Sequence, residues 1–257
     1  MLSPAPQHDD YPTRAPDEAH VPSPRGLRLV SPAVMLDQPA GGVALPARPY
    51  AHVVKRACDL LTTTILLILL CPLLALIALA ITLDSPGPIF YNRTRVGKDG
   101  REFVMYKFRT MGPDAERRLA DLQHLNKGGA HMVKIVGDPR VTRAGRLLRA
   151  SSLDELPQLF NVLKGEMSMV GPRPQTPTEV ALYNDEQRRR LAVAPGITGL
   201  WQVSDRHNPS FERWVHWDLT YIAQWSLWLD ARIVWRTAVM IAADSSAAVA
   251  RLLMSAS

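Results

Sequence analysis

The chain has 257 residues, of which 47% are hydrophobic and 21% are charged, and its formal net charge is +6. This length allows one domain or two, and the apolar content excludes a wholly disordered chain. Two cysteines without a CxxC pair exclude a disulfide framework and a zinc ribbon. Only one long uncharged apolar run is present, which excludes a polytopic membrane protein.

Residues 1–50 hold ten of the 21 prolines and show no hydrophobic periodicity, which predicts a disordered tail. This tail has four basic and five acidic residues, so the rest of the chain has 26 and 19 and a net charge of +7. The basic part contains no DNA-binding motif and no aromatic RNA-binding signature, so we expect no nucleic-acid partner.

Residues 60–83 contain no charged side chain. As a straight helix they would reach about 36 Å, enough to cross a bilayer core. Pro72 removes a backbone hydrogen bond in the middle of this run, so a bend is predicted at Cys71-Pro72. Basic residues flank the run on both sides, and positive charge near a membrane helix favours the cytoplasmic side. A re-entrant helix that breaks there and a kinked spanning helix both remain open, with the re-entrant form slightly favoured.

The following segment predicts a hairpin and then helices. Strands are expected at 89–91 and 103–108 around a turn at 97–100, and a helix at 114–125. Arginines recur at every third position from 140 to 149, which indicates one face of a helix. Another helix is predicted to open within 151–157, where either serine could form a capping box.

All six tryptophans lie between Trp201 and Trp235, and several of them have helical spacing. They could form a core face or an interfacial aromatic belt, and the sequence leaves both interpretations open.

Asp154 and Glu155 are adjacent carboxylates in a predicted first helical turn. The helix dipole there favours the ionised form, which suits a nucleophile or a Mg²⁺ ligand, although simple capping is the commoner use. Cationic side chains and two stiffening prolines favour a phosphate site: Lys107, Arg109, Arg149, Pro172, Arg173 and Pro174. Guanidinium groups match phosphate bidentately, as a phosphoanhydride substrate would require. The alternative is a solvated or anionic-lipid-binding surface, which residues 188–190 fit better.

Five segments together resemble the bacterial sugar transferase family, the monotopic phosphoglycosyl transferases. In order, they are KRACDL (55–60), SPGPIFY (85–91), YKFRTM (106–111), SLDELPQLFNVLKGEMSMVGPRP (152–174) and PGITGLWQV (195–203). The resemblance covers about residues 52–242. Cys71-Pro72 stands where the family often has Ser-Pro, and Ser204-Asp205-Arg206 where it often has a glycine after the serine.

The resemblance implies transfer of a sugar 1-phosphate from a UDP-sugar to undecaprenyl phosphate, with release of UMP, at the start of exopolysaccharide, capsule or O-antigen synthesis. It implies that Asp154 is the nucleophile and a Mg²⁺ ligand, and that Glu155 assists. It assigns Arg149 to the polyprenyl phosphate and the Pro172–Pro174 loop to the uridine nucleotide. Lys107 and Arg109 are weaker phosphate candidates.

We therefore expect an α+β, mostly helical fold, with a re-entrant membrane helix and a cytoplasmic catalytic domain that carries a small β-hairpin and amphipathic interfacial helices. The expected parts are a tail (1–50), the re-entrant helix (51–84), the catalytic domain (85–245) and a C-terminal tail (246–257). The expected location is the cytoplasmic face of the bacterial inner membrane, in contact with its lipids, and a homodimer is compatible with the family. The rival hypothesis is a membrane-anchored, non-catalytic scaffold or regulator of polysaccharide assembly.

Overall fold

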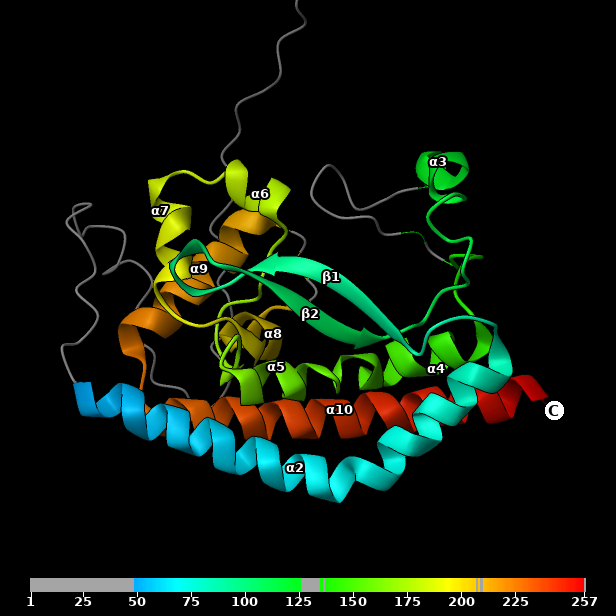
Figure 1. Ribbon diagram of the computed structural model, residues 1–257, viewed down its shortest axis with the longest axis horizontal. Helices are drawn as coiled ribbons and strands as arrows, with labels where there is room; N and C mark the ends of the chain where they lie inside the picture. Colours follow the sequence, from blue (N-terminus) through cyan, green and yellow to red (C-terminus); the bar gives the residue numbers. More distant parts are fainter. Residues whose placement is uncertain (1–48, 126–134, 136, 207, 209, 257) are drawn as a thin grey trace, which may run out of the picture. The chain divides into compact units, whose positions relative to one another are not determined.

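The computed structural model of the protein describes residues 49–125, 135, 137–206, 208 and 210–256. The predicted N-terminal tail lies outside these residues, except for its last two positions. The described part is mostly helical and contains an antiparallel hairpin and a short parallel strand pair (Figure 1). The predicted helical fold with a small hairpin is confirmed in this respect.

One long helix, α2 (Pro49–Asp84), carries the whole apolar run. It contains Pro72 and bends near its middle, which is the expected consequence of a proline inside a helix (Figure 1). One narrow face, which includes Thr63, Ile77 and Ile81, is buried against the rest of the protein. Only 11% of its most apolar window is buried, and the helix is long and apolar enough to cross a membrane. The composition of α2 is therefore that of a membrane segment.

The N-terminal end of α2 is bonded to two other helices, α5 (Gln158–Lys164) and α10 (Leu227–Ala256). The Lys55 ammonium pairs with the Asp230 carboxylate of α10 at 2.7 Å. The Arg56 guanidinium donates to the carbonyl of Val162 at 2.6 Å and to the next carbonyl of α5 at 2.9 Å. Since the last carbonyls of a helix lack intrahelical partners, Arg56 caps α5 and fixes α2 to it.

The C-terminal end of α2 is bonded to the same part of the protein. The Arg109 guanidinium is buried and donates to the carbonyls of Pro86 and Ser85 at 2.6 and 2.7 Å. The Asp84 carboxylate accepts a hydrogen bond at 2.9 Å from the backbone N–H of Ala144, in the first turn of α4 (Arg143–Ser151). Both ends of α2 are therefore held by polar bonds.

The hairpin consists of β1 (Phe90–Val96) and β2 (Glu102–Phe108), joined by a 3₁₀ turn, η1 (Lys98–Gly100). The predicted strands and turn are confirmed, although β1 is longer than expected. The Asn161 side chain of α5 accepts from the Tyr106 N–H and donates to the Val104 carbonyl, which attaches β2 to α5.

The helix predicted at 114–125 is shorter than expected. Only α3 (Leu119–Leu122) and the 3₁₀ segment η2 (Gln123–Leu125) are helical, because hydrogen-bonded turns occupy the first half. Helix α4 carries three of the four regularly spaced arginines. Arg140 precedes the helix and is paired with Asp138 at 2.7 Å, so the row is not one helical face.

The helix predicted to open within 151–157 is divided, and the capping box is wrong. Ser151 ends α4, and Ser152 has a left-handed φ of 57° and makes no side-chain cap. The chain turns there into a short 3₁₀ segment, η3 (Leu153–Glu155), before α5 begins. The acidic pair therefore lies on a single 3₁₀ turn between two α-helices.

Two strands that the sequence did not predict, β3 (Ser168–Val170) and β4 (Gly196–Thr198), pair in parallel. A Cβ atom on Gly196 would lie 2.0 Å from the backbone nitrogen of Gly171, so this approach requires glycine. The remaining helical segments are α6 (Pro177–Ala181), α7 (Asp185–Arg188), η4 (Arg189–Ala192), α8 (Leu200–Ser204) and α9 (Phe211–Gln224). Helix α10 continues to Ala256, through the predicted C-terminal tail.

The tryptophans divide between core and surface. Trp217 and Tyr221 of α9 are buried, whereas Trp228 and Trp235 of α10 are 71% and 70% exposed. The core interpretation therefore holds for α9, while α10 presents indole rings to its surroundings. Helices α2 and α10 both pack against α4, and we call them the apolar layer (Figure 1).

Candidate active site

The acidic pair on η3 lies beside cationic side chains from two distant segments. The Lys107 ammonium, on β2, forms an ion pair with the Glu155 carboxylate at 2.5 Å. The Arg173 guanidinium approaches the same oxygen of Glu155 to 3.6 Å. The structure thus brings together three of the residues that the sequence analysis singled out, from three different segments.

Glu155 is held in its ionised form. Burial alone would raise the pKa of Glu155, but the charges of Lys107 and Arg173 outweigh it and lower the pKa to about 2. Hydrogen bonds from Lys107 and Gln158 act in the same direction. The Glu155 carboxylate is therefore charged at neutral pH and already occupied by its partners.

Asp154 is in a different state from its neighbour. Burial raises the pKa of the Asp154 carboxyl, and the charge of Glu155 adds to this, while Lys107 and Arg149 act in the opposite direction. The expectation of a lowered pKa for both carboxyls is wrong for Asp154, because burial outweighs the influences that favour its ionised form. Within the described residues, no side chain forms an ion pair with Asp154, whereas Glu155 is paired with Lys107 and Arg173.

Arg149 lies in the last turn of α4, a few residues before the acidic pair in the sequence. Its Nε donates to the Thr110 hydroxyl at 2.8 Å, and the side chain is otherwise exposed. Its charge acts on Asp154. Arg149 is therefore near the acidic pair and accessible to an anion.

Arg109 is placed differently from the other predicted phosphate ligands. Its guanidinium faces the end of α2 and donates to the carbonyls of Ser85 and Pro86. These bonds give Arg109 a structural role at the end of α2, and it does not contact the acidic pair in the described structure.

The loop of Pro172, Arg173 and Pro174 is anchored by the segment PGITG (195–199). The N–H of Gly171 donates to the Thr198 carbonyl, and the N–H of Gly196 donates to the Pro172 carbonyl, each at 2.9 Å. Both prolines are buried, whereas the Arg173 side chain is 37% exposed. A fixed backbone therefore presents a partly accessible guanidinium beside Glu155.

Arg95 of β1 is a functional candidate that the sequence analysis missed. Burial and the nearby charge of Arg173 lower the pKa of the Arg95 guanidinium, and Glu179 pairs with it at 3.8 Å. Two guanidinium groups that repel each other favour an anion between them. The available signal was the alternation of Arg93 and Arg95 between the predicted strand at 89–91 and the predicted turn at 97–100.

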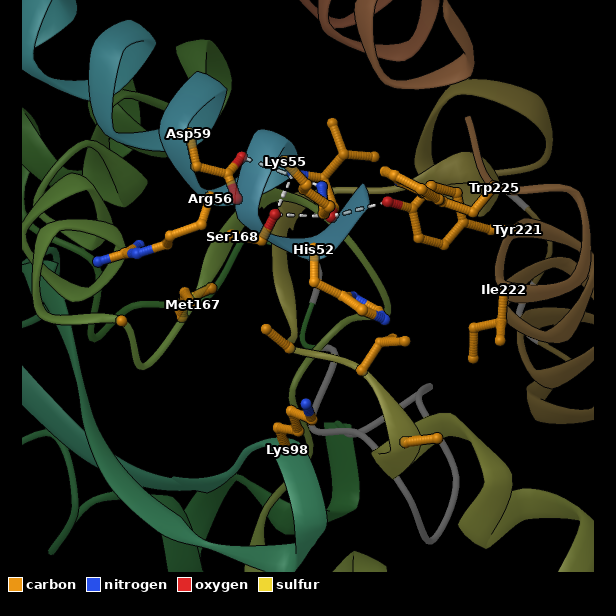
Figure 2. A pocket seen from close by; sticks show the side chains of 15 residues that line it. His52, Lys55, Arg56, Asp59, Lys98, Met167, Ser168, Tyr221, Ile222 and Trp225 are labelled. Carbon is orange, nitrogen blue, oxygen red and sulfur yellow. Dashed lines mark hydrogen bonds and ion pairs between the residues drawn. The ribbon is translucent and has the colours of Figure 1, made fainter. Parts of the chain in front are cut away.

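A cavity of about 220 Å³ lies beside the N-terminal end of α2 (Figure 2). Figure 2 shows His52 pointing into it, and the His52 ring stacks near Trp225. Two of its basic side chains, Lys55 and Arg56, are already bonded to a carboxylate and to carbonyls. The acidic pair does not line this cavity. We therefore place the candidate site at Asp154 and not in this cavity.

The sequence model of the family described as "Bacterial sugar transferase" matches residues 50–244. The chain belongs to the bacterial sugar transferase family. The predicted family is thus confirmed, and the match includes α2, the hairpin, the acidic pair and most of α10.

Three relatives illustrate the family. The chain is 44% identical over 187 residues to the galactosyl transferase CpsE of Streptococcus agalactiae, covering 72% of this chain and 41% of that protein. It is 39% identical over 234 residues to the undecaprenyl-phosphate galactose phosphotransferase of Salmonella typhimurium, covering 86% and 48%. It is 40% identical over 194 residues to the exopolysaccharide production protein ExoY of Rhizobium meliloti, covering 74% and 86%. The chain thus spans less than half of the first two proteins and most of the third.

Two departures from the family pattern are accommodated by the fold. The α2 helix continues through Cys71 and Pro72, and both side chains are exposed. At the other departure Asp205 has a φ of −150°, and its carboxylate pairs with Arg213 at 2.6 Å. The segment there needs no left-handed residue, so the missing glycine is not required.

The surroundings of Asp154 fit a Mg²⁺ ion that binds together with a substrate. Among the described residues, no group of three or more His, Cys, Asp or Glu side chains could hold a metal. Glu155 is engaged by its cationic partners, so Asp154 offers the free carboxylate oxygens. Mg²⁺ is usually held by one or two carboxylates plus substrate phosphates and water, which this arrangement allows.

Proposed function

We propose that this sugar transferase moves a sugar 1-phosphate from a UDP-sugar to undecaprenyl phosphate and releases UMP, as the initiating step of exopolysaccharide synthesis. The observation that carries the proposal is Asp154, a half-buried carboxylate that forms no ion pair within the described residues. The charges of Lys107 and Arg149 act on it, and Arg173 lies beside its neighbour Glu155. The names of two relatives support the substrate class, since one is an undecaprenyl-phosphate galactose phosphotransferase and the other an exopolysaccharide production protein.

In the first half-reaction, Asp154 attacks the phosphorus that adjoins the sugar. A bond forms between the carboxylate oxygen and phosphorus, and the bond from phosphorus to the bridging oxygen of the diphosphate breaks. UMP leaves with that oxygen. Burial leaves the Asp154 carboxylate poorly solvated, while Lys107 and Arg149 favour its ionised form, so it can act as a nucleophile.

In the second half-reaction, a phosphate oxygen of undecaprenyl phosphate attacks the same phosphorus. The bond to Asp154 breaks, the carboxylate is restored, and the sugar leaves on an undecaprenyl diphosphate. This is a ping-pong sequence, because UMP departs before the lipid reacts.

The cationic residues divide between the two substrates. Arg173 would bind the phosphates of the nucleotide, since its guanidinium is partly accessible and its backbone is fixed. Arg149 would bind the lipid phosphate from the last turn of α4. Glu155 and Lys107 keep each other charged and in place. Mg²⁺ bound at Asp154 would neutralise charge on the substrate phosphates.

We also propose that α2 is re-entrant and that the enzyme sits on the cytoplasmic face of the inner membrane. Polar bonds join both ends of α2, at Lys55 and at Asp84, to helices of the same catalytic part. A spanning helix would put one end on the far side of the bilayer from its partners. The exposed apolar residues of α2 and of α10 would then face lipid.

Cysteine labelling tests this topology. Cys58 and Cys71 are both exposed and must first be replaced by serine. Single cysteines at Val53 and Asn92, both exposed, should then react with an impermeant reagent only in inside-out vesicles. Labelling of the two positions from opposite sides would contradict the re-entrant helix.

The test of function uses membrane fractions with Mg²⁺, undecaprenyl phosphate and radiolabelled UDP-galactose or UDP-glucose. We expect release of UMP and a labelled lipid from one of the two, both lost in Asp154→Asn and kept in the exposed control Asp185→Asn. The absence of turnover with any UDP-sugar would favour the rival, a membrane-anchored scaffold.

A further inference from the structure

Arg190 is one of the three consecutive arginines that, from the sequence, fit a solvated or anionic-lipid-binding surface better than a phosphate site. The structure contradicts that assignment for this residue, because Arg190 is only 3% exposed. Its guanidinium lies 5.7 Å from the centre of the Tyr183 ring and 5.5 Å from that of Phe211. A buried guanidinium needs partners for its donors, so its hydrogen bonds show what it holds in place.

The guanidinium of Arg190 connects three separate segments. Its Nε donates to the Asp218 carboxylate of α9 at 2.8 Å, and its Nη1 donates to the Tyr183 hydroxyl at 2.6 Å. Its Nη2 lies 2.6 Å from the Asp218 carboxylate and donates to the backbone carbonyl of Arg173 at 3.3 Å. Asp218 and Tyr183 therefore fix Arg190, and Arg190 in turn bonds the backbone of Arg173.

We propose that Arg190 is a positioning residue for nucleotide binding: it holds the backbone of the Pro172–Pro174 loop so that the Arg173 guanidinium stays beside Glu155. The identity of the substrate in this proposal rests on the proposed function, whereas the contact between Arg190 and the loop does not. Among the described residues Arg190 has no hydrogen bond or ion pair with Asp154 or Glu155, and its proposed action is through Arg173.

The geometry requires arginine. A planar guanidinium has five donors in a fixed fork, so it can serve Asp218, Tyr183 and the Arg173 carbonyl at once. A lysine at this position could keep the charge opposite Asp218, but its ammonium is a single point and cannot span all three acceptors. Arg190→Lys therefore removes the loop contact while leaving a cation for the buried carboxylate.

Steady-state kinetics separate positioning from general damage. In a ping-pong reaction, kcat/KM for each substrate reports only its own half-reaction. Arg190→Lys should lower kcat/KM for the UDP-sugar about tenfold, because a displaced binding group costs rate even when the chemistry is intact. It should leave kcat/KM for undecaprenyl phosphate within about twofold. An equal fall in both constants, or in neither, would overturn the proposal.

A double-mutant cycle tests whether Arg190 acts through Arg173. In an Arg173→Ala background, Arg190→Lys should cost less than about twofold, since the group to be positioned is already absent. A full tenfold loss in that background would show an independent role and contradict the proposal. The exposed neighbour Arg188, changed to lysine, is the matched control.

Hydrogen exchange provides a readout that does not depend on activity. The amides of Arg173 and Gln175 should exchange faster in Arg190→Lys than in Arg188→Lys, with the amides of α9 unchanged. If Arg190→Lys does not fold, Tyr183→Phe removes one fixing bond, and it should speed the same exchange and lower kcat/KM for the UDP-sugar two- to tenfold. Unchanged exchange in the variant that folds would refute the positioning role. Failure of the wild type to release UMP would refute the proposed function alone.

Discussion

The acidic pair and the apolar layer of α2 and α10 are built in different ways. Around Asp154 and Glu155, a few charged side chains come from distant segments, and among the described residues no neighbouring side chain can take over the role of any one of them. In the apolar layer, two continuous helices present many exposed apolar residues of similar kind. Substitution effects should therefore be concentrated in the first region and spread thinly over the second, and three predictions test this contrast.

The largest effect is expected from Lys107→Met. Glu155 would lose its nearest cation, and burial would then raise the pKa of Glu155 from its present value of about 2. We expect kcat to fall about 100-fold, since a positive charge that acts on both Asp154 and Glu155 would be lost.

The pH profile of this variant sharpens the prediction. Because removing Lys107 raises the pKa of Glu155, activity should be lost at a higher pH on the acidic side than in the wild type. The exposed Lys98, changed to methionine, is the control. An unchanged acidic limb would mean that Lys107 does not govern Glu155.

An intermediate effect is expected from Arg109→Met. The carbonyls of Ser85 and Pro86 would lose a charged donor, and the free energy of unfolding should fall by about 3 kcal/mol. Thermal denaturation in detergent measures this, with the exposed Arg117→Met as control. A raised KM for the UDP-sugar with unchanged Tm would instead make Arg109 the phosphate ligand that its sequence context suggested.

The smallest effects are expected in the apolar layer. Trp228→Ala and Trp235→Ala should each weaken partitioning into lipid vesicles about fivefold, with little change in Tm. The buried Trp217→Ala is the contrasting variant, and it should lower the free energy of unfolding by about 3–5 kcal/mol. If neither exposed substitution affects vesicle binding, the proposal that α10 lies at the membrane surface is contradicted.

The same contrast explains what the sequence could predict. The apolar run, its bend at Pro72 and the hairpin are local patterns, and all three are present in the structure. Asp154 could be picked out by composition and resemblance, but not its raised pKa, because that depends on burial, which outweighs the opposing charge of Lys107.

The arginines show the limit most clearly. Arg109, Arg173 and Arg190 are the same residue type, yet their roles differ. Arg109 bonds the end of α2, Arg173 approaches Glu155, and Arg190 bonds the backbone of the Pro172–Pro174 loop. These roles depend on contacts between residues far apart in the chain, such as Arg190 with Asp218. The parallel pairing of β3 and β4 was also missed, because it joins distant segments and each strand is only three residues long.

The most direct test of the account is to look for the covalent intermediate without the lipid acceptor. Purified protein in nanodiscs that lack undecaprenyl phosphate would receive the accepted UDP-sugar and Mg²⁺, and intact-protein and peptide mass spectrometry would follow. We predict about one equivalent of UMP and a mass increase of one sugar phosphate on Asp154. UMP release that requires the lipid, or a modification on any other residue, would contradict the assignment of Asp154 as the nucleophile.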